Sequence, residues 1–171
     1  MPVDEIQPTR AGLLIVRRRM ALAEQIHHLL KMKLDGMMLE LIKLADQAAR
    51  ERQELEERYT RAREMAAVAA MMEGATGVLL AALSVETAPT YTPGHRNVFG
   101  VHLPALEPVM VKKTLVQRGY GILGTSSVID DAADAYEALL EEVIRSAELE
   151  GGITRLLDDI ERTRRRVNAL E

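Results

Sequence analysis

Residues 30–44 read LKMKLDGMMLELIKL, and apolar side chains recur there at alternating steps of three and four residues. The same stepping from Leu13 to Leu83 meets 21 positions, and 17 of them are apolar. The exceptions are His27, Glu51, Arg58 and Thr76. A mean spacing of 3.5 residues over about ten heptads is typical of a left-handed coiled coil. At 1.5 Å per residue the segment would reach roughly 110 Å, so the pattern predicts a rod.

Proline divides the chain into two helical stretches and an insert. None of the six prolines lies between residues 9 and 88 or after residue 108, and proline is poorly tolerated inside helices. We therefore expect an N-terminal coiled-coil helix over 9–84, an insert over 85–125 and a C-terminal coiled-coil helix over 126–171. Only five aromatic residues, four Tyr and one Phe, occur in the 171. That scarcity favours narrow helix packing over an ordinary compact core.

The insert carries strand and turn signals. Residues 85–91 contain Thr and Val, and residues 97–103 are bounded by Gly94 and Pro104. We read these features as one short β-hairpin that projects from the rod. The predicted fold class is therefore all-α: a long two-helix antiparallel coiled coil, or helical hairpin, with a short β-hairpin insert at the tip region.

The second helix repeats the 3.5-residue pattern less cleanly, with nine of 13 positions apolar from Ile129 onward. Gly151 and Gly152 lie inside it. Each glycine costs about 1 kcal/mol relative to alanine, so the pair predicts a bend or a loosened turn.

The two helices are unequal in length. In an antiparallel hairpin closed near residue 84, residue 126 lies beside about residue 80, and Glu171 lies opposite about residue 35. Residues 9–34 then have no partner, although they continue the apolar pattern. Exposing that face is unfavourable, so we expect it to be covered by another chain or by roughly 25–35 further C-terminal residues.

Charges occur in blocks along the chain. Residues 10–33 hold six basic residues against one acid, and residues 126–161 hold 11 acids against two arginines. Four arginines follow, at Arg162, Arg164, Arg165 and Arg166. The expected register places them beside residues 40–44, near Glu40 and Asp46. They are either a solvated helix face with weak ion pairs or a docking site for acidic loops of a surrounding protein.

No residue pattern predicts catalysis, a cofactor or a metal site. The chain has no cysteine and a net charge of −4, so neither thiol chemistry nor nucleic-acid binding is indicated. His27 and His28 are adjacent and diverge by about 100° on a helix, which prevents both from binding one metal. Residues 65–85 hold only Glu73 as a charge, but the uncharged runs of 8 and 12 residues are too short for membrane insertion.

Five short blocks resemble, in chain order, the D subunit of the rotary V-type/A-type ATPases. They are PTR at 8–10 followed by Leu13 and Leu14, LLKMK at 29–33, RNVFGV at 96–101, YGILGT at 120–125 and RRRVNALE at 164–171. The last block is the most specific, and the resemblance covers essentially the whole chain. Members of that family usually continue well past the NALE motif, which agrees with the uncovered apolar face.

The resemblance implies a non-catalytic rotor component, the central stalk, without a cofactor of its own. Its paired helices would stand inside the hexamer of catalytic A and non-catalytic B subunits. Its lower part would bind the F subunit, and it would rest on the ring-capping C/d subunit, peripherally on the cytoplasmic side of the membrane. Rotation would couple ATP hydrolysis or synthesis to proton or sodium transport.

The candidate partner-binding residues fall in two groups, the arginine cluster and the start of the hairpin. They are Arg162, Arg164, Arg165, Arg166, Arg96, Asn97, Val98 and Phe99. Two other functional classes stay open on the residues alone. One is a homo-oligomeric coiled-coil scaffold or tether, which fits self-association of the 171-residue chain. The other is a nucleic-acid or membrane adaptor that uses the basic N-terminal segment.

Overall fold

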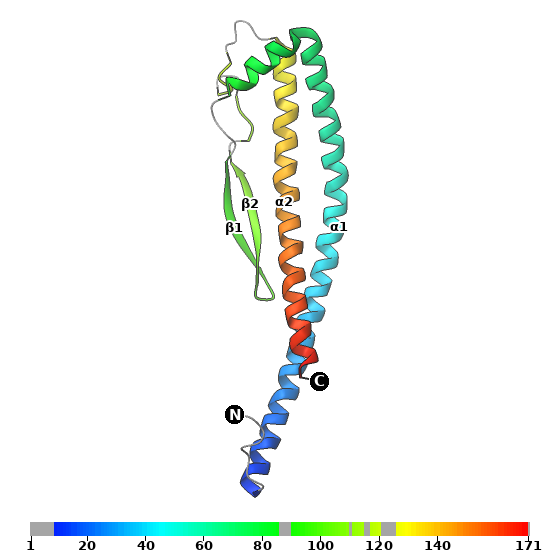
Figure 1. Ribbon diagram of the computed structural model, residues 1–171, viewed down its shortest axis with the longest axis vertical. Helices are drawn as coiled ribbons and strands as arrows, with labels where there is room; N and C mark the ends of the chain where they lie inside the picture. Colours follow the sequence, from blue (N-terminus) through cyan, green and yellow to red (C-terminus); the bar gives the residue numbers. More distant parts are fainter. Residues whose placement is uncertain (1–8, 86–89, 110, 115–116, 121–125, 171) are drawn as a thin grey trace.

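The computed structural model describes residues 9–85, 90–109, 111–114, 117–120 and 126–170. Two helices, α1 (Arg10–Leu83) and α2 (Ser127–Asn168), run antiparallel, and a two-stranded hairpin of β1 (Thr90–Val98) and β2 (Val101–Val109) lies along α2 (Figure 1). The predicted fold class, a long helical hairpin with a short β-hairpin insert, is confirmed.

Helix α1 is capped at its start and broken near its end. The backbone N–H of Gly12 donates to Oγ1 of Thr9 at 3.1 Å, which satisfies one of the free donors of the first turn. At Gly74 the backbone takes φ 77° and ψ 160°, a conformation that only glycine adopts readily. Beyond it, the last turns of α1 cross over the end of α2 (Figure 1).

The two helices pair in a different register from the predicted one. Arg58 Nε lies 3.4 Å from Glu142 Oε2, and Lys33 Nζ lies 3.2 Å from Asp159 Oδ2. The residue numbers of these partners add to 200 and 192, whereas the predicted register requires about 206. The physical reason is that the paired part of α1 ends at Gly74 and not near residue 84.

The core lies in two clusters along the rod. The middle cluster contains residues of α1, α2 and the hairpin. Its buried members are Met37, Leu44, Val101, Leu103, Leu149, Leu156 and Ile160. The second cluster lies near the break in α1, and its buried members are Ala69, Ala81, Ile129 and Ala132. Burial of each large aliphatic side chain is worth about 1.5–3 kcal/mol, so the middle cluster contributes most of the packing energy.

The hairpin turns through two residues, Phe99 and Gly100. Both have positive φ, 51° and 83°, as a type I′ turn requires, and Asn97 Oδ1 accepts from the Gly100 N–H at 2.9 Å. Val98 pairs with Val101 on either side of the turn. The turn therefore lies inside the stretch 97–103 that the sequence analysis singled out.

The hairpin also does not project from the rod as expected. It lies flat on the helices, because Val101 and Leu103 of β2 are buried in the middle cluster. Both strands are edge strands of a two-stranded sheet, which explains why Pro93 and Pro104 are tolerated inside them.

The bend predicted at Gly151 and Gly152 is also wrong. Helix α2 continues through both residues. A Cβ atom at Gly151 would lie 3.3 Å from Cγ of Pro104, so the glycine lets β2 approach the helix closely. The sequence alone indicates a local weakness at this pair, whereas tertiary packing explains Gly151.

Apolar residues at the far end of α1 are more exposed than the heptad pattern predicts. Met72, Leu79 and Leu83 occupy apolar positions of the pattern, yet all three are exposed. The break at Gly74 explains the exposure of Leu79 and Leu83, because it turns the last helical turns away from a continuous seam. By length and composition α1 contains a stretch that could cross a membrane, a property shared by core helices of soluble proteins.

Candidate partner-binding surfaces

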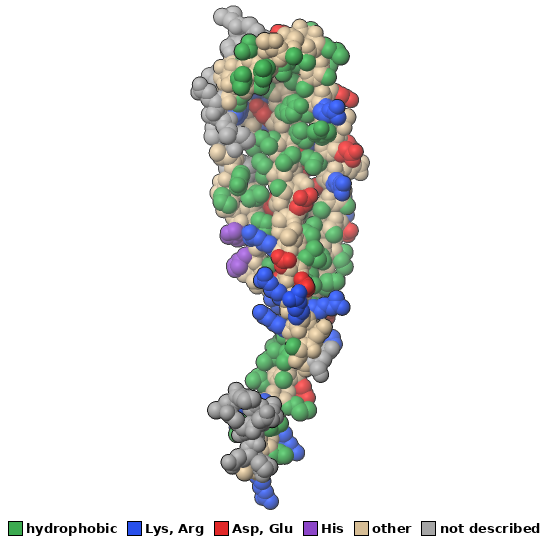
Figure 2. Space-filling model, in the orientation of Figure 1, with side chains coloured by type: hydrophobic (Ala, Val, Ile, Leu, Met, Phe, Trp, Pro, Cys, Tyr) green, Lys and Arg blue, Asp and Glu red, His purple; other side chains and the backbone are tan. Residues whose placement is uncertain are grey.

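The four arginines of α2 form a basic collar, defined by Arg162, Arg164, Arg165 and Arg166. Because Lys33 binds Asp159 and the helices are antiparallel, the collar lies beside the part of α1 around Lys33. All four are exposed residues in the last turns of the helix. Figure 2 shows basic side chains gathered where the rod narrows toward α1 alone.

The ion pairs expected between the collar and the acids of α1 are not formed. Glu40 instead binds Lys43 at 3.6 Å and Arg96 of the hairpin at 3.8 Å. Arg165 pairs with Glu161 one turn earlier on its own helix. Within the described part of the chain, the other three collar arginines have no carboxylate within ion-pair distance. Their guanidinium groups therefore face solvent and can meet an acidic partner.

The hairpin residues that the sequence analysis singled out make contacts mostly within the chain. Val98 packs against the middle cluster, and Asn97 shapes the turn. Arg96 reaches α1 through Glu40, and the Phe99 ring lies over Gly36 of the same helix. Arg96 and Phe99 are still about half exposed, so both present an outer face.

The structure brings the collar and the hairpin turn to neighbouring levels of the rod. A Cβ atom on Gly100 would lie 4.0 Å from Nζ of Lys33, which itself binds Asp159 one turn before the collar. On α2, the Nη1 atom of Arg155 donates to the carbonyl of His102 at 3.1 Å. These contacts place basic groups from all three elements within one section of the rod.

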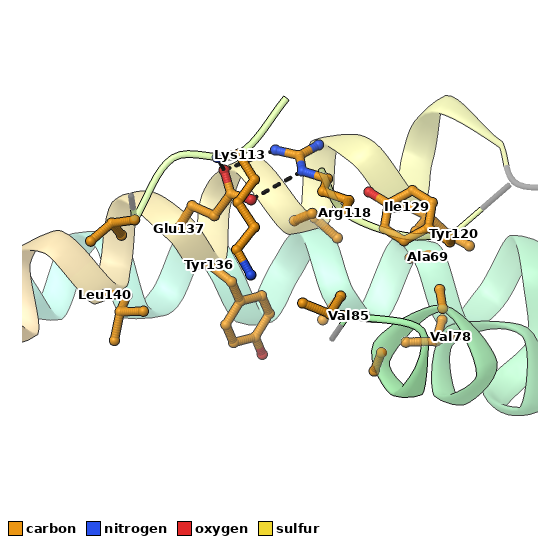
Figure 3. Close-up of a pocket in the computed structure, with 16 residues that line it drawn as sticks. Ala69, Val78, Val85, Lys113, Arg118, Tyr120, Ile129, Tyr136, Glu137 and Leu140 are labelled. Atoms are coloured by element: carbon orange, nitrogen blue, oxygen red, sulfur yellow. Dashed lines mark hydrogen bonds and ion pairs between the residues drawn. The ribbon is translucent and has the colours of Figure 1, made fainter. Parts of the chain in front are cut away.

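A second surface lies at the opposite end, around a cavity of about 750 Å³. Its walls come from α1 on both sides of the break, from α2 and from the loop that precedes α2 (Figure 3). Most of the lining is apolar, including Val78, Ile129, Tyr136 and Leu140. The same end of α1 also carries exposed apolar residues: Met71, Met72, Leu79, Leu80 and Leu83.

One side of the cavity is formed by a buried arginine, Arg118, whose side chain is 3% exposed. Its Nε and Nη2 atoms donate to the two oxygens of Glu137 at 3.0 and 2.9 Å, and Nη2 also donates to Asp134. The Glu137 hydrogen bond is the largest cause that raises the pKa of Arg118 above its ordinary value. The guanidinium is thus permanently charged and fixes the loop to α2, so it cannot act as a general acid or base.

Tyr120 belongs to the same group of contacts. Its hydroxyl donates to Oδ1 of Asp130 at 2.7 Å, and burial raises the pKa of Tyr120 to about 12. The sequence analysis missed this network. The available signal was a run of acids at 130, 134 and 137, spaced to share one helix face.

These surfaces suit binding to a partner. Among the described residues, no group of three or more His, Asp or Glu side chains lies close enough to hold a metal ion. A two-helix rod with a charged collar on one side and an apolar surface at one end is typical of a structural or mechanical component of a larger assembly.

The comparisons with known proteins identify that assembly. The family model for the D subunit of ATP synthase matches residues 12–171. The D subunit of the A-type ATP synthase of Methanoregula boonei is 48% identical over 171 residues, which is 100% of this chain and 82% of the relative. That of Methanosarcina mazei is 42% identical over the same share of each chain.

A third relative, from Halorubrum lacusprofundi, is 43% identical over 167 residues, covering 98% of this chain and 73% of its own length. The chain belongs to the family of ATP synthase D subunits, so the resemblance seen in the sequence motifs is confirmed. It is therefore a component of a membrane-associated ATP synthase complex.

Proposed function

We propose that this chain is the central rotor stalk of an A-type ATP synthase, a non-catalytic component that transmits torque. The observation that carries the proposal is its membership of the D-type family over residues 12–171. The paired helices support it, because torque transmission needs a long element whose two strands are packed against each other. Rotation would couple ATP synthesis or hydrolysis in the head to proton or sodium movement through the membrane.

The basic collar supports a specific contact with the head. Three of its guanidinium groups have no carboxylate partner among the described residues, and they are suited to meet acidic loops of the surrounding A and B subunits. Charge attraction of this kind guides a partner without deep packing, which suits a surface that must move past several subunits in turn. We expect the outer face of the hairpin turn to contribute to the same contact.

The apolar end beyond Gly74 supports a second contact, with the ring-capping C/d subunit. Leu79, Leu80 and Leu83 are all exposed there, and large exposed apolar patches mark interaction sites. The side of the rod would also bind the F subunit. In this arrangement the chain would be peripheral, on the cytoplasmic side of the membrane, without crossing it.

Co-expression with the A and B subunits of the same complex tests the head contact. We expect the wild-type chain to co-purify with the head, and the variant R162E/R164E/R166E to lose most of this binding at low salt. The matched control, R50E/R52E, reverses two exposed arginines of α1 outside the collar. Equal loss for both variants, or no loss for either, would contradict the role of the collar.

Activity measurements test the non-catalytic role. The purified chain should not hydrolyse ATP, and adding it to the A and B subunits should change their turnover. A point change in this chain that abolished ATP hydrolysis by the isolated chain would contradict the proposal.

One observation favours a second function, that of a homo-oligomeric coiled-coil scaffold. The first turns of α1 extend beyond the end of α2 and carry exposed apolar residues such as Leu13 and Met20 (Figure 1). A scaffold would form a stable dimer or trimer in solution and would not bind the head. Light scattering coupled to size exclusion, with and without the A and B subunits, separates the two functions.

A further inference from the structure

We propose that the β-hairpin is a strap that fastens α1 to α2, and that Gly36 and Gly151 are the two seats, one for the turn of the hairpin on α1 and one for β2 on α2. The strap is a property of the chain itself. It can therefore be tested without the A and B subunits and independently of the rotor function.

On the α2 side, the strap is held by apolar and polar contacts. Leu103 of β2 is 1% exposed and belongs to the middle cluster. The backbone N–H of Leu106 donates to Oε2 of Glu148 at 3.1 Å, and Arg155 donates to the carbonyl of His102 at the same distance. Pro104 lies directly over Gly151, where a Cβ atom would be 3.3 Å from its Cγ.

On the α1 side, the strap is held at its turn. A Cβ atom on Gly36 would lie 2.6 Å from Cζ and 2.7 Å from Cε1 of Phe99, distances that carbon atoms do not reach without a shift. The ring therefore occupies the space that any other residue at position 36 would fill. One turn further along α1, Oε1 of Glu40 forms an ion pair with Nη2 of Arg96 at 3.8 Å.

The strap covers the part of the core that α1 and α2 form around Met37 and Leu156. Met37 of α1 and Leu156 of α2 are both 0% exposed, and they pack in one cluster with Val101 and Leu103. Nearer the break, the buried positions of α1 are alanines such as Ala62 and Ala69, which two helices can cover alone. The large buried side chains of α1, Met37 and Leu44, therefore occur where the hairpin supplies a third layer.

The hairpin in turn depends on the helices. An isolated two-stranded hairpin is marginally stable in water, and both strands here are edge strands. Lifting the turn from Gly36 should therefore loosen the whole hairpin and relax the contact between the helices. The section of rod around Met37 and Leu156 should be its stiffest part.

Hydrogen exchange of the backbone amides in 95–103, measured on the 171-residue chain, tests the seats. We expect Gly36→Ala to raise the exchange rate by about tenfold or more, because the new methyl group displaces Phe99. Gly151→Ala should give a smaller increase, since Pro104 needs to shift only slightly. Gly152→Ala is the matched control, because its Cβ atom would meet nothing within 4 Å. Far-UV circular dichroism should show all three variants fully helical.

A double-variant cycle sharpens the test at the turn. Phe99→Ala should raise exchange in the wild-type background by removing the ring contact. In the Gly36→Ala background the same change should lower exchange, because the smaller side chain removes the clash. Equal effects of Phe99→Ala in the two backgrounds, or the same exchange for Gly36→Ala as for Gly152→Ala, would overturn the assignment of the seat.

Interhelix distances test the fastening itself. The chain has no cysteine, so spin labels can be placed uniquely at the exposed positions Lys43 and Asp158 through K43C and D158C. We expect a narrow distance distribution in the wild-type background and a clearly broader one with Gly36→Ala. An unchanged distribution despite fast hairpin exchange would show that the hairpin is a passive attachment and not a strap.

Discussion

Two neighbouring parts of α1 share one apolar pattern but have opposite environments. In the segment that α2 and the hairpin cover, Met37 is 0% exposed and Leu44 is 4% exposed. In the segment that precedes Lys33, Leu13 is 53% exposed and Met20 is 62% exposed, although they belong to the same apolar pattern. The pattern thus identifies which face of a helix is apolar, and the neighbouring elements decide whether that face is buried.

The same contrast between covered and exposed positions applies to two arginines. Arg118 is enclosed by carboxylates of α2, whereas Arg17 lies on an exposed part of α1. Arg118→Met should lower the free energy of unfolding by about 3–5 kcal/mol, because it removes a buried charge and leaves Glu137, whose side chain is 14% exposed, without its counter-ion. Urea unfolding measures this, with Arg17→Met as the control that should change stability by less than about 0.5 kcal/mol. Similar values for both would mean that the Arg118 network does not stabilise the loop.

A methionine pair compares the two segments directly. Met37→Ala should cost about 2–5 kcal/mol in the isolated chain, because it opens a cavity in the middle cluster. Met20→Ala should change stability by less than about 0.5 kcal/mol, since the side chain is already exposed. Both variants make the same change in one helix. The difference between their unfolding free energies, measured by calorimetry, therefore reports whether α2 and the hairpin cover the methionine. A large cost at Met20 would show that its face is covered in solution, for instance by a second copy of the chain.

Limited proteolysis compares the same segments without changing a residue. Trypsin should cleave after Arg17 or Arg18 about tenfold faster than after Arg50, because packing against a partner supplies most of the stability of a helix. Mass spectrometry of early fragments gives the order of cleavage. Restoring a chain or segment that covers the apolar face should remove the difference. Equal rates in the dilute chain would contradict the contrast between the segments.

The smallest expected effect is a loss of stability at high pH. The pKa of Tyr120 is raised from its ordinary value near 10 to about 12 in the folded state. A raised pKa favours the protonated form on folding, so its contribution is complete below about pH 10 and is lost between about pH 10 and 12. Unfolding curves across this range should fall more steeply for the wild-type chain than for Tyr120→Phe. Parallel curves would show that neither burial nor the Asp130 contact raises the pKa of Tyr120 in the folded chain.

The helical parts of the fold were predictable because their signal is local and repetitive. A period of 3.5 residues and the absence of proline define long amphipathic helices whatever covers them. The break at Gly74 was not predictable in this way, because the apolar pattern continues through Leu79 and Leu83 as if the helix did too.

The glycines and the hairpin depend on tertiary contacts that the sequence does not display. Local propensity marks Gly151 as a weak point, but Pro104, 47 residues earlier in the chain, explains it. The sequence does not locate the hairpin turn, because Phe99 occupies a position of positive φ that usually holds Asn, Asp or Gly. The arginines of the collar can be recognised in the sequence as a run of charges. The residues that lie beside them on α1 cannot be assigned until the pairing register of the two helices is known.

Rotation of the chain inside an ATP-hydrolysing head is the most direct test of the central claim. Since the chain has no cysteine, Met71→Cys gives one attachment point for a bead at an 85% exposed position near the apolar end. With the A and B subunits fixed to a surface, we predict one-directional rotation of the bead that requires ATP and stops when ATP is withdrawn. A bead that stays stationary while the same head hydrolyses ATP at its full rate would contradict the account of this chain as a rotor.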